Sequence, residues 1–548
     1  MPIYIPSRVS PRLWPALMHR LAVVTIAVLI CIMAGTAPAH ATASESAERQ
    51  QVLDTMKRAT TFMVEKVAYK GGYVWAYLPD FSRRWGEMEA HQTMIWLQPP
   101  GTASMGHVYL DAWHATGDEY YYKAAEQVAA ALIWGQHPSG GWNYVVDFGG
   151  DRSLRDWYAT VGRNAWRLEE FQHYYGNATF DDQVTSDAAK FLLRLYVEKF
   201  DPRYKPALDK AIAFVLDSQY PIGGWPQRYP LNHEFSRHGR PDYSSYLTFN
   251  DDVAAENISF LIFCYQILGD ARLLDPIVRG MNFFLVTQQG PPQPGWALQY
   301  TPDLKPAAAR SYEPLALATH TTASNIDHLI SFYRLTGETK FLARVPEAID
   351  WLEARRLPAG PDEKGRTHPT FIELGTDKPL YVHRRGSNVV NGEYYVDYDS
   401  RRTPGHYSAF RRVDIAGLRE RYKAAKAIAA EVVTKTSPLA AGQGVTELPR
   451  YFAMEYAPVK PGDSRKQVDA VLSHLNSTGY WPAPLAQTSH PYRNDGSKEP
   501  ARGDFASTYV GDETDTSPFT DSAPPSVIST AEYLRNMNVL IHWLAESR

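Results

Sequence analysis

Apolar and polar residues follow one another along most of this chain with the period of an α-helix that is buried on one side. From Val278 to Leu285, for example, apolar residues recur at every third or fourth position, so they fall on one face of a helix. Such stretches come in pairs, and a short turn of glycine, aspartate or proline separates the members of a pair. These turns lie at residues 116–118, 200–202, 268–270 and 336–338. The pattern predicts a series of antiparallel helical hairpins.

A short aromatic motif accompanies each hairpin. It reads Gly-Gly-Tyr at 71–73, Gly-Gly-Trp at 140–142 and 223–225, and Pro-Gly-Trp at 294–296. Successive copies are about 70 to 80 residues apart, and hairpins that repeat at a fixed period stack side by side. We predict an all-α fold, an (α/α) toroid, because a ring brings the loops that carry the motif to one face. An open solenoid is the alternative that the repeat allows.

The first 41 residues have the composition of an export signal. They contain three arginines but no lysine, aspartate or glutamate, an apolar run from Leu21 to Met33, and the sequence Ala-Pro-Ala-His-Ala at 37–41. This order of basic, apolar and small residues is typical of a secretory signal peptide. The apolar run is shorter than the ~20 residues that a membrane-spanning helix needs. We expect cleavage after Ala41 and a secreted or periplasmic protein that has no membrane partner.

The repeat divides the rest of the chain into three parts. Residues 42–119 are expected to form an N-terminal helical part of the toroid, and residues 120–440 its main, catalytic part. Beyond residue 440 the period fades, and only an apolar stretch from Thr530 to Ala545 again predicts a helix. We expect residues 441–548 to form an appendage that packs on the toroid through this last helix.

The charge balance limits the kind of partner. The 548 residues contain 56 Lys and Arg against 60 Asp and Glu, a net charge of −4, and loss of the three arginines in residues 1–41 makes the chain more acidic. A chain without a basic excess is a poor partner for nucleic acid, and an acidic substrate must be bound by a few local cations. Cys264 would be the only cysteine after cleavage, which excludes an intrachain disulfide and predicts a buried apolar role. We expect a monomer.

Two related acidic motifs open consecutive helices. Thr-Phe-Asp-Asp lies at 179–182 and Thr-Phe-Asn-Asp-Asp at 248–252. Such residues at the start of a helix can simply cap its free amide groups. Because the motifs occupy the same place in neighbouring repeats, we expect Asp181 and Asp251 to converge, and adjacent carboxylates of this kind bind hard cations.

Arginines in loops are the candidate binders of an acidic substrate. Arg310 stands among small residues before a predicted helix, although a surface ion pair with Glu313, which would contribute little stability, is the simpler interpretation. A later loop region combines pairs of arginines with tyrosines, and these residue types bind carboxylates and stack on sugars. An ordinary solvated loop would explain the same composition. The candidate substrate-binding residues are Arg384, Arg385, Arg401, Arg402, Trp225 and Asn250.

Four motifs occur in an order and spacing that resemble one family. They are Gly-Gly-Trp-Pro-Gln at 223–227, Thr-Phe-Asn-Asp-Asp at 248–252, Trp-x-x-Gln-Tyr at 296–300 and Lys-Pro-x-x-Ala-Arg-x-Tyr-Glu at 305–313. Over residues 120–435 the chain resembles polysaccharide lyase family 10, the pectic acid lyases. The resemblance implies an (α/α)₃ toroid that cleaves polygalacturonate by β-elimination with Ca²⁺.

The resemblance also implies roles for individual residues. Asp181 and Asp251 would serve the site of calcium and the substrate carboxylate. Arg310 would be the base that removes the proton, and because arginine normally stays protonated in proteins, this role rests on the resemblance alone. Arg384, together with Arg401 or Arg402, would bind the substrate.

This sequence departs from the family pattern in two places. At 182–184 Asp-Gln-Val replaces Asn-Gly-Ala, and at 383–386 His-Arg-Arg-Gly replaces Gly-Arg-Asp-Gly. Two other functions stay open: a glycoside hydrolase on the same toroid with Asp181 and Asp251 as its acid/base pair, and a non-catalytic protein that binds uronate polysaccharides.

Overall fold

The computed structural model of this protein describes most of the chain. The expected signal segment, residues 1–41, and the side chains of Arg384 and Arg385 lie outside the description. The chain divides into a unit of residues 1–48 and a second unit of residues 49–548, and the buried core belongs to the second. The described residues are 43–162, 169–232, 242–362, 364–385, 393–401, 403, 407, 409–440, 459–460, 462, 464–485 and 526–546.

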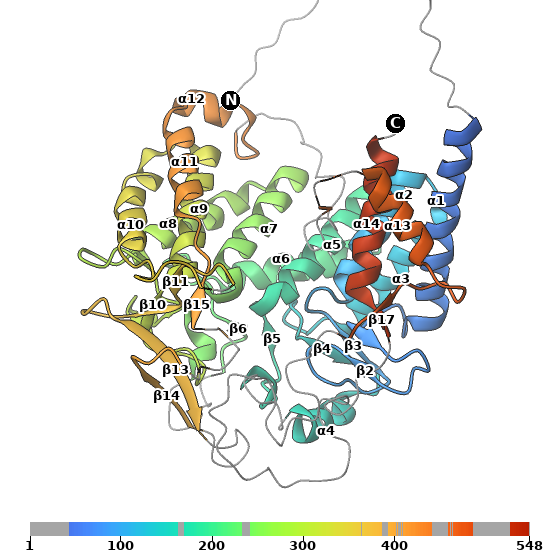
Figure 1. Ribbon diagram of the computed structural model, residues 1–548, viewed down its shortest axis with the longest axis horizontal. Coiled ribbons are helices and arrows are strands. Elements are labelled where there is room, and N and C mark those ends of the chain that lie inside the picture. Colours follow the sequence, from blue (N-terminus) through green and yellow to red (C-terminus); the bar gives the residue numbers. More distant parts are fainter. Residues whose placement is uncertain are drawn as a thin grey trace, which may run out of the picture. The chain divides into compact units, whose positions relative to one another are not determined.

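Four helical pairs follow one another as the repeat predicts (Figure 1). Within each pair the two helices pack together, and the first helices of the first three pairs, α2, α5 and α7, lie side by side in this order. The predicted all-α fold, built of the helical pairs of an (α/α) toroid, is thereby confirmed. The pairs are α2 (Thr102–Thr116) with α3 (Glu119–Gly135), α5 (Val184–Lys199) with α6 (Lys205–Ser218), α7 (Val253–Leu268) with α8 (Leu274–Thr287), and α9 (Thr319–Thr336) with α10 (Val345–Glu353).

The turns inside the pairs lie where the sequence places them. Gly117, Gly269 and Gly337 follow α2, α7 and α9 with φ of 75°, 66° and 71°. Glycine adopts this left-handed conformation without steric cost, and its N–H then closes the last helical turn. The remaining α-helices are α1 (Ala43–Phe62), α4 (Asp151–Thr160), α11 (Ile415–Lys426), α12 (Ala430–Val433), α13 (Ser464–His474) and α14 (Thr530–Glu546).

Short antiparallel strands precede the first helix of each pair. β3, β5 and β7 lead into α2, α5 and α7, and each is paired with a strand that follows an aromatic motif, β4, β6 and β8. This pairing brings the beginnings of these helices to one end of the array. The strands are β1 (Ala76–Tyr77), β2 (Arg84–Trp85), β3 (Met94–Trp96), β4 (Val145–Asp147), β5 (Ala178–Thr179), β6 (Arg228–Tyr229), β7 (Leu247–Thr248), β8 (Gln299–Tyr300), β9 (Pro306–Ala307), β10 (Ala316–Ala318), β11 (His368–Pro369), β12 (Phe371–Glu373), β13 (Pro379–Arg385), β14 (Glu393–Asp397), β15 (Phe410–Arg411), β16 (Pro482–Ala483) and β17 (Val527–Ser529).

The tryptophans of the aromatic motif hold the helical pairs together. The indole N–H of Trp142 donates to the carbonyl of Leu132 at 2.8 Å, and that of Trp225 donates to the carbonyl of Val215 at the same distance. Trp225 is fully buried, so it presents no ring face on which a sugar could stack. The prediction that Trp225 binds substrate is therefore wrong: the residue belongs to the core.

The C-terminal segment is tied into the helical array. Trp481 Nε1 donates to the carbonyl of Val471 at 2.9 Å, which repeats the contact of the earlier motifs beyond the point where the sequence period fades. α14 packs against α2 and α13. The hydroxyl of Tyr533 in α14 lies 2.6 Å from that of Thr60 in α1, and β17 pairs with β1. The last helix thus completes the packing of the N-terminal part.

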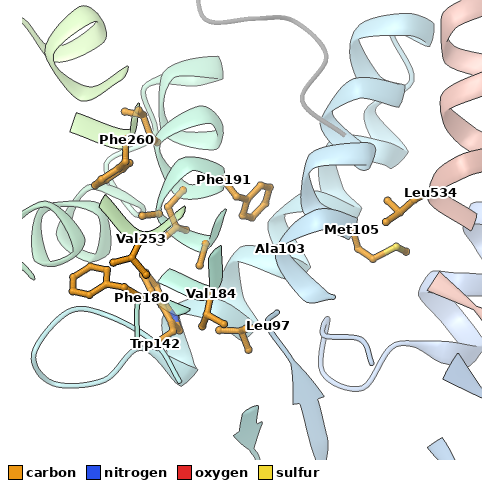
Figure 2. Close-up of a cluster of buried hydrophobic side chains, with 14 of the residues drawn as sticks. Leu97, Ala103, Met105, Trp142, Phe180, Val184, Phe191, Val253, Phe260 and Leu534 are labelled. Atoms are coloured by element: carbon orange, nitrogen blue, oxygen red, sulfur yellow. The ribbon is translucent and has the colours of Figure 1, made fainter. Parts of the chain in front are cut away.

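Fully or almost fully buried side chains fill the space behind the beginnings of α5 and α7 (Figure 2). Phe180, Val184 and Trp142 gather there with Val253 of α7. Cys264 is also fully buried, as predicted. In the part of the chain that the structure describes, no helix is long and apolar enough to cross a membrane.

Candidate active site

Three loop-to-helix junctions are built in the same way. The backbone N–H of Leu97 donates to the carbonyl of Tyr144 at 2.8 Å, and the N–H groups of Phe180 and Phe249 make the equivalent bonds, both 2.9 Å, to Gln227 and Leu298. Three residues lead from Phe180 into α5 and from Phe249 into α7, and four lead from Leu97 into α2. This register makes Gln98, Asp181 and Asn250 equivalent, and it makes Pro99, Asp182 and Asp251 equivalent.

The acidic residues of two junctions have an unusual backbone. Asp182 and Gln183 have φ of 47° and 60°, and Asp251 and Asp252 have φ of 52° and 54°. Two consecutive left-handed residues are costly for most side chains, and aspartate and asparagine tolerate the conformation best. The turn that they form sets Asp181 and Asn250 into the protein, where they are buried, and leaves Asp182 and Asp251 partly exposed.

Three carboxylates converge at these junctions. Asp181, Asp182 and Asp251 each offer an oxygen, and these oxygens lie within 4.8 Å of one another. The sequence predicted Asp181 and Asp251 but missed Asp182, although the alignment of the two Thr-Phe motifs places Asp182 where the second motif has Asp251. Gln98 donates its amide to Asp182 Oδ2 at 2.7 Å and to Glu87 Oε2 at 2.9 Å. A pocket of about 350 Å³ opens beside the carboxylates and is lined by Gln98, Pro99, Asp182, Gln183, Asp251 and Asp252.

Arg310 lies among these carboxylates. Its side chain is 2% exposed. Nη2 contacts Asp181 Oδ2, which also accepts the hydroxyl of Tyr144, and Nη1 lies 3.0 Å from Glu313 Oε1 and 3.8 Å from Asp251 Oδ2. The interpretation of Arg310 and Glu313 as a surface pair is therefore wrong, because both residues are buried and the pair forms part of a larger network.

Glu313 is the acceptor that holds this network. Its Oε2 accepts the backbone N–H of Arg310 at 2.9 Å. Its Oε1 accepts the Arg310 guanidinium at 3.0 Å, the Tyr407 hydroxyl at 2.8 Å and the Asn250 amide at 3.1 Å. Asn250 also donates to Asp251 Oδ2 at 2.7 Å. Since Asn250 is 3% exposed and its amide nitrogen is engaged in these bonds, it positions Asp251 and does not face a substrate as predicted.

A segment far away in sequence holds the loop of Arg310 in place. Glu169 Oε2 accepts the backbone N–H of Ser311 at 2.8 Å, and Glu170 Oε2 accepts the hydroxyl of Tyr312 at 2.8 Å and lies 3.5 Å from Arg310 Nε. Burial raises the pKa of Glu170 to about 7, although Arg310 opposes this rise. Sequence reasoning missed these contacts, because two adjacent glutamates look like an ordinary solvated surface.

The ionisable groups of the cluster differ in the direction of their pKa shifts. Burial tends to raise the pKa of Asp181, but Arg310 lowers it, and the net pKa lies below the ordinary value. Burial and the neighbouring carboxylates raise the pKa of Asp182 and of Asp251 well above the ordinary value. Burial tends to lower the pKa of Arg310, yet Asp181 and the other nearby acids leave it well above the ordinary value. The cluster therefore holds more carboxyl groups than Arg310 alone can balance, and a further cation would favour their ionised forms.

Of the four predicted substrate-binding arginines, the structure describes the side chain of Arg401 alone. Arg401 is exposed and forms an ion pair with Asp399 at 2.7 Å. Arg384 and Arg385 lie in β13, paired with β14, but their side chains are outside the described residues, as is the whole of Arg402. Their contacts with substrate stay a prediction.

The sequence comparison supports the family resemblance. Residues 150–364 match the family model described as pectic acid lyase. This segment is similar to the pectic acid lyases, which supports a polysaccharide lyase. The matched segment contains Asp181, Asp182, Asp251 and Arg310. No curated protein sequence matches the chain.

Similar solved structures include lyases and other carbohydrate-active proteins. The family 10 polysaccharide lyase from Cellvibrio cellulosa, in a mutant form in complex with trigalacturonic acid, is 18% identical, covers 60% of this chain and 98% of its own, and has a TM-score of 0.39. The GH76A α-1,6-mannanase from Salegentibacter sp. HEL1_6 is 12% identical over 91% of this chain and 100% of its own, with a TM-score of 0.37. The cellobiose 2-epimerase from Bacillus thermoamylovorans B4167 is 10% identical over 91% and 98%, with a TM-score of 0.43.

Proposed function

We propose that this polysaccharide lyase cleaves polygalacturonate by β-elimination, with Ca²⁺ held by Asp181, Asp182 and Asp251 and with Arg310 as the group that accepts the proton. The observation that carries the proposal is the convergence of three carboxylates and one buried arginine beside a single pocket. The family match and the sequence motifs support the same reaction.

The residues present fit a calcium ion. Calcium prefers carboxylate and carbonyl oxygens, and it accepts flexible coordination. Oδ1 of Asp181 is buried and has no hydrogen-bond partner, which is a costly state for a carboxylate oxygen that a cation would relieve. Asp182 and Asp251 border the pocket, so that they could share the ion with a carboxylate of the substrate.

β-Elimination removes the proton on the sugar carbon that bears the carboxylate and expels the glycosidic oxygen from the neighbouring carbon. Calcium bound to the three aspartates would neutralise the substrate carboxylate, stabilise the developing negative charge, and weaken the ion pairs that keep Arg310 protonated. The side chain of Arg310 is held by Glu313, 3.0 Å from Nη1, and by Glu170, 3.5 Å from Nε. These contacts fix its orientation, and as the base Arg310 would act in its neutral form, having first released its proton to water, which the charge of a nearby cation would favour.

The geometry favours this reaction over glycoside hydrolysis. A hydrolase places two carboxyl groups about 5 to 9.5 Å apart, on either side of the bond that it cleaves. Here one oxygen each of Asp181, Asp182 and Asp251 lies within 4.8 Å of the others. Such a group is arranged to hold one cation.

The test measures the ultraviolet absorption of the unsaturated product. The protein is incubated with polygalacturonate, in Ca²⁺ and in chelator, and we expect product only with Ca²⁺. The Arg310→Ala variant should bind trigalacturonate but form no product, whereas Arg272→Ala, which removes an arginine that is 84% exposed and pairs with Asp270, serves as a matched control for charge. Cleavage to saturated sugars that is indifferent to chelator would instead show a hydrolase, and binding without turnover in the unchanged protein would show a binding protein.

We also propose that the chain is exported, because residues 1–41 have the composition of a signal peptide. N-terminal sequencing of protein from the culture medium and from the periplasm should give a chain that begins at Thr42.

A further inference from the structure

Arg411 is a cation close to the candidate active site that no described carboxylate neutralises. It lies in β15, where its carbonyl accepts the backbone N–H of Thr367 at 2.8 Å. Its side chain is half-buried, and its Nε is buried without a hydrogen-bond partner. The next residue, Arg412, is exposed and donates to the carbonyls of Gly365 and Lys364 at 3.2 and 2.9 Å. Arg412 therefore has a structural role that Arg411 lacks.

Tyr407 connects Arg411 with the carboxylate cluster. The guanidinium carbon of Arg411 lies 5.6 Å from the centre of the Tyr407 ring. At the other end of this ring, the hydroxyl accepts the amide of Asn250 at 2.6 Å and donates to Glu313 at 2.8 Å. Arg411 is thus one aromatic ring away from the residues that position Asp251.

The neighbours of Arg411 leave its charge available. His320 lies 6.5 Å from the Tyr407 ring, and burial and Arg411 lower the pKa of His320 to about 3, so His320 is neutral at ordinary pH. The charge of Asp251 also reaches Arg411: burial lowers the pKa of Arg411, while Tyr407 and Asp251 oppose this effect. A half-buried guanidinium without a bonded partner costs free energy, and the backbone pairing of β15 does not require it. An anionic ligand would offset this cost.

We propose that Arg411 binds the carboxylate of a second uronate, next along the polymer from the uronate at the aspartate cluster. The inference rests on the proposed function and extends it to substrate choice. A polyuronate carries one carboxylate on each sugar, so a second cation near the aspartate cluster can bind the carboxylate of a neighbouring sugar. Guanidinium forms two parallel, charge-assisted hydrogen bonds with a carboxylate, which a methyl ester cannot reproduce. Arg411 therefore selects unesterified polymer at this position.

The experiment compares Arg411→Ala, Arg411→Lys and the control Arg412→Ala. With polygalacturonate, Arg411→Ala should raise KM about 10- to 100-fold, the loss of one strong charge-assisted contact, with a much smaller effect on kcat. Arg411→Lys keeps the charge but not the paired nitrogens. Its KM should lie between that of the unchanged protein and that of Arg411→Ala. On methyl-esterified pectin, Arg411→Ala should change KM little, so the preference for the free acid falls. Arg412→Ala should behave as the unchanged protein in both assays.

Calorimetric binding of trigalacturonate separates this inference from the proposed reaction. If the unchanged protein forms no unsaturated product but Arg411→Ala still weakens binding, the reaction is refuted and the role of Arg411 stands. If the protein is a lyase and Arg411→Ala matches Arg412→Ala in binding and KM, the role of Arg411 is refuted. Equal melting temperatures for the variants show that a loss of binding is not caused by a loss of fold. If Arg411→Ala melts at a lower temperature, the binding and KM of Arg411→Lys are compared with those of Arg412→Ala, and equal values refute the role of Arg411.

Discussion

Replacing Glu313 by glutamine tests how the protein keeps Arg310 buried. The substitution preserves size and shape but removes one charge from a carboxylate that accepts two hydrogen bonds from Arg310 and one each from Tyr407 and Asn250. Glutamine offers one acceptor oxygen and turns an N–H₂ group toward donors that need acceptors. Arg310 then loses its closest compensating charge apart from Asp181, in a place that is 2% exposed.

The expected cost can be worked out from these contacts. Gln299 donates a further, longer bond to Glu313 at 3.4 Å. About two of these bonds lose their acceptor, and a hydrogen bond to a charged group contributes about 1.5 to 3 kcal/mol. The unfolding free energy should therefore fall by about 3 to 5 kcal/mol, which is the range for breaking a buried ion pair. With an unfolding entropy of about 2.1 cal/mol/K per residue, a chain of 548 residues should melt about 3 to 4 °C lower.

The assay is differential scanning calorimetry of Glu313→Gln beside Glu338→Gln. Glu338 is 46% exposed and pairs with Lys340 on the surface, so its replacement should change the melting temperature by less than about 0.5 °C, as expected for an exposed pair. Glu313→Gln should also lose most lyase activity, because Arg310 is no longer held. A Glu313→Gln protein that melts and turns over like the control would refute the argument that Glu313 compensates Arg310.

Three further predictions test the cluster and the fold. Because Asp182 and Asp251 have raised pKa values, protons compete with Ca²⁺ for these carboxylates as the pH falls. The calcium affinity measured by calorimetry should therefore be lower at pH 5 than at pH 8, and a constant affinity would contradict the raised pKa values. Trp225→Ala should lower the unfolding free energy by about 3 to 5 kcal/mol by opening a cavity, whereas Trp134→Ala, at a residue that is 55% exposed, should change it far less; similar effects in the two variants would contradict a core role for Trp225. Leu534→Ala, at a fully buried position of α14, should lower the unfolding free energy of the whole protein by about 2 to 5 kcal/mol, and early melting of a separate C-terminal part with the rest unchanged would show that the tail is an independent appendage.

The local part of the site could be predicted from the sequence, but the partners of its residues could not. The two Thr-Phe motifs and the loop of Arg310 were recognisable because residue type and spacing identify them directly. Asp182 was missed although the two motifs align it with Asp251, and the matching backbone bonds of Phe180 to Gln227 and of Phe249 to Leu298 bear out that alignment. The hydrogen bond from the backbone N–H of Ser311 to Glu169 joins residues 142 positions apart, and no local sequence pattern predicts such a contact.

The sequence by itself determined the helical hairpins, their repeat and the chemical groups at the helix starts. These features depend on side-chain periodicity and on turn residues, which act over a few positions of the chain. Only the tertiary structure decided that Trp225 is buried in the core, that α14 packs beside α2, that Arg310 is enclosed by acids, and that Arg411 has no hydrogen-bonded partner among the described residues. Burial and charge compensation are properties of packing between distant segments, and the same residue type is a surface group or a buried one according to what packs against it.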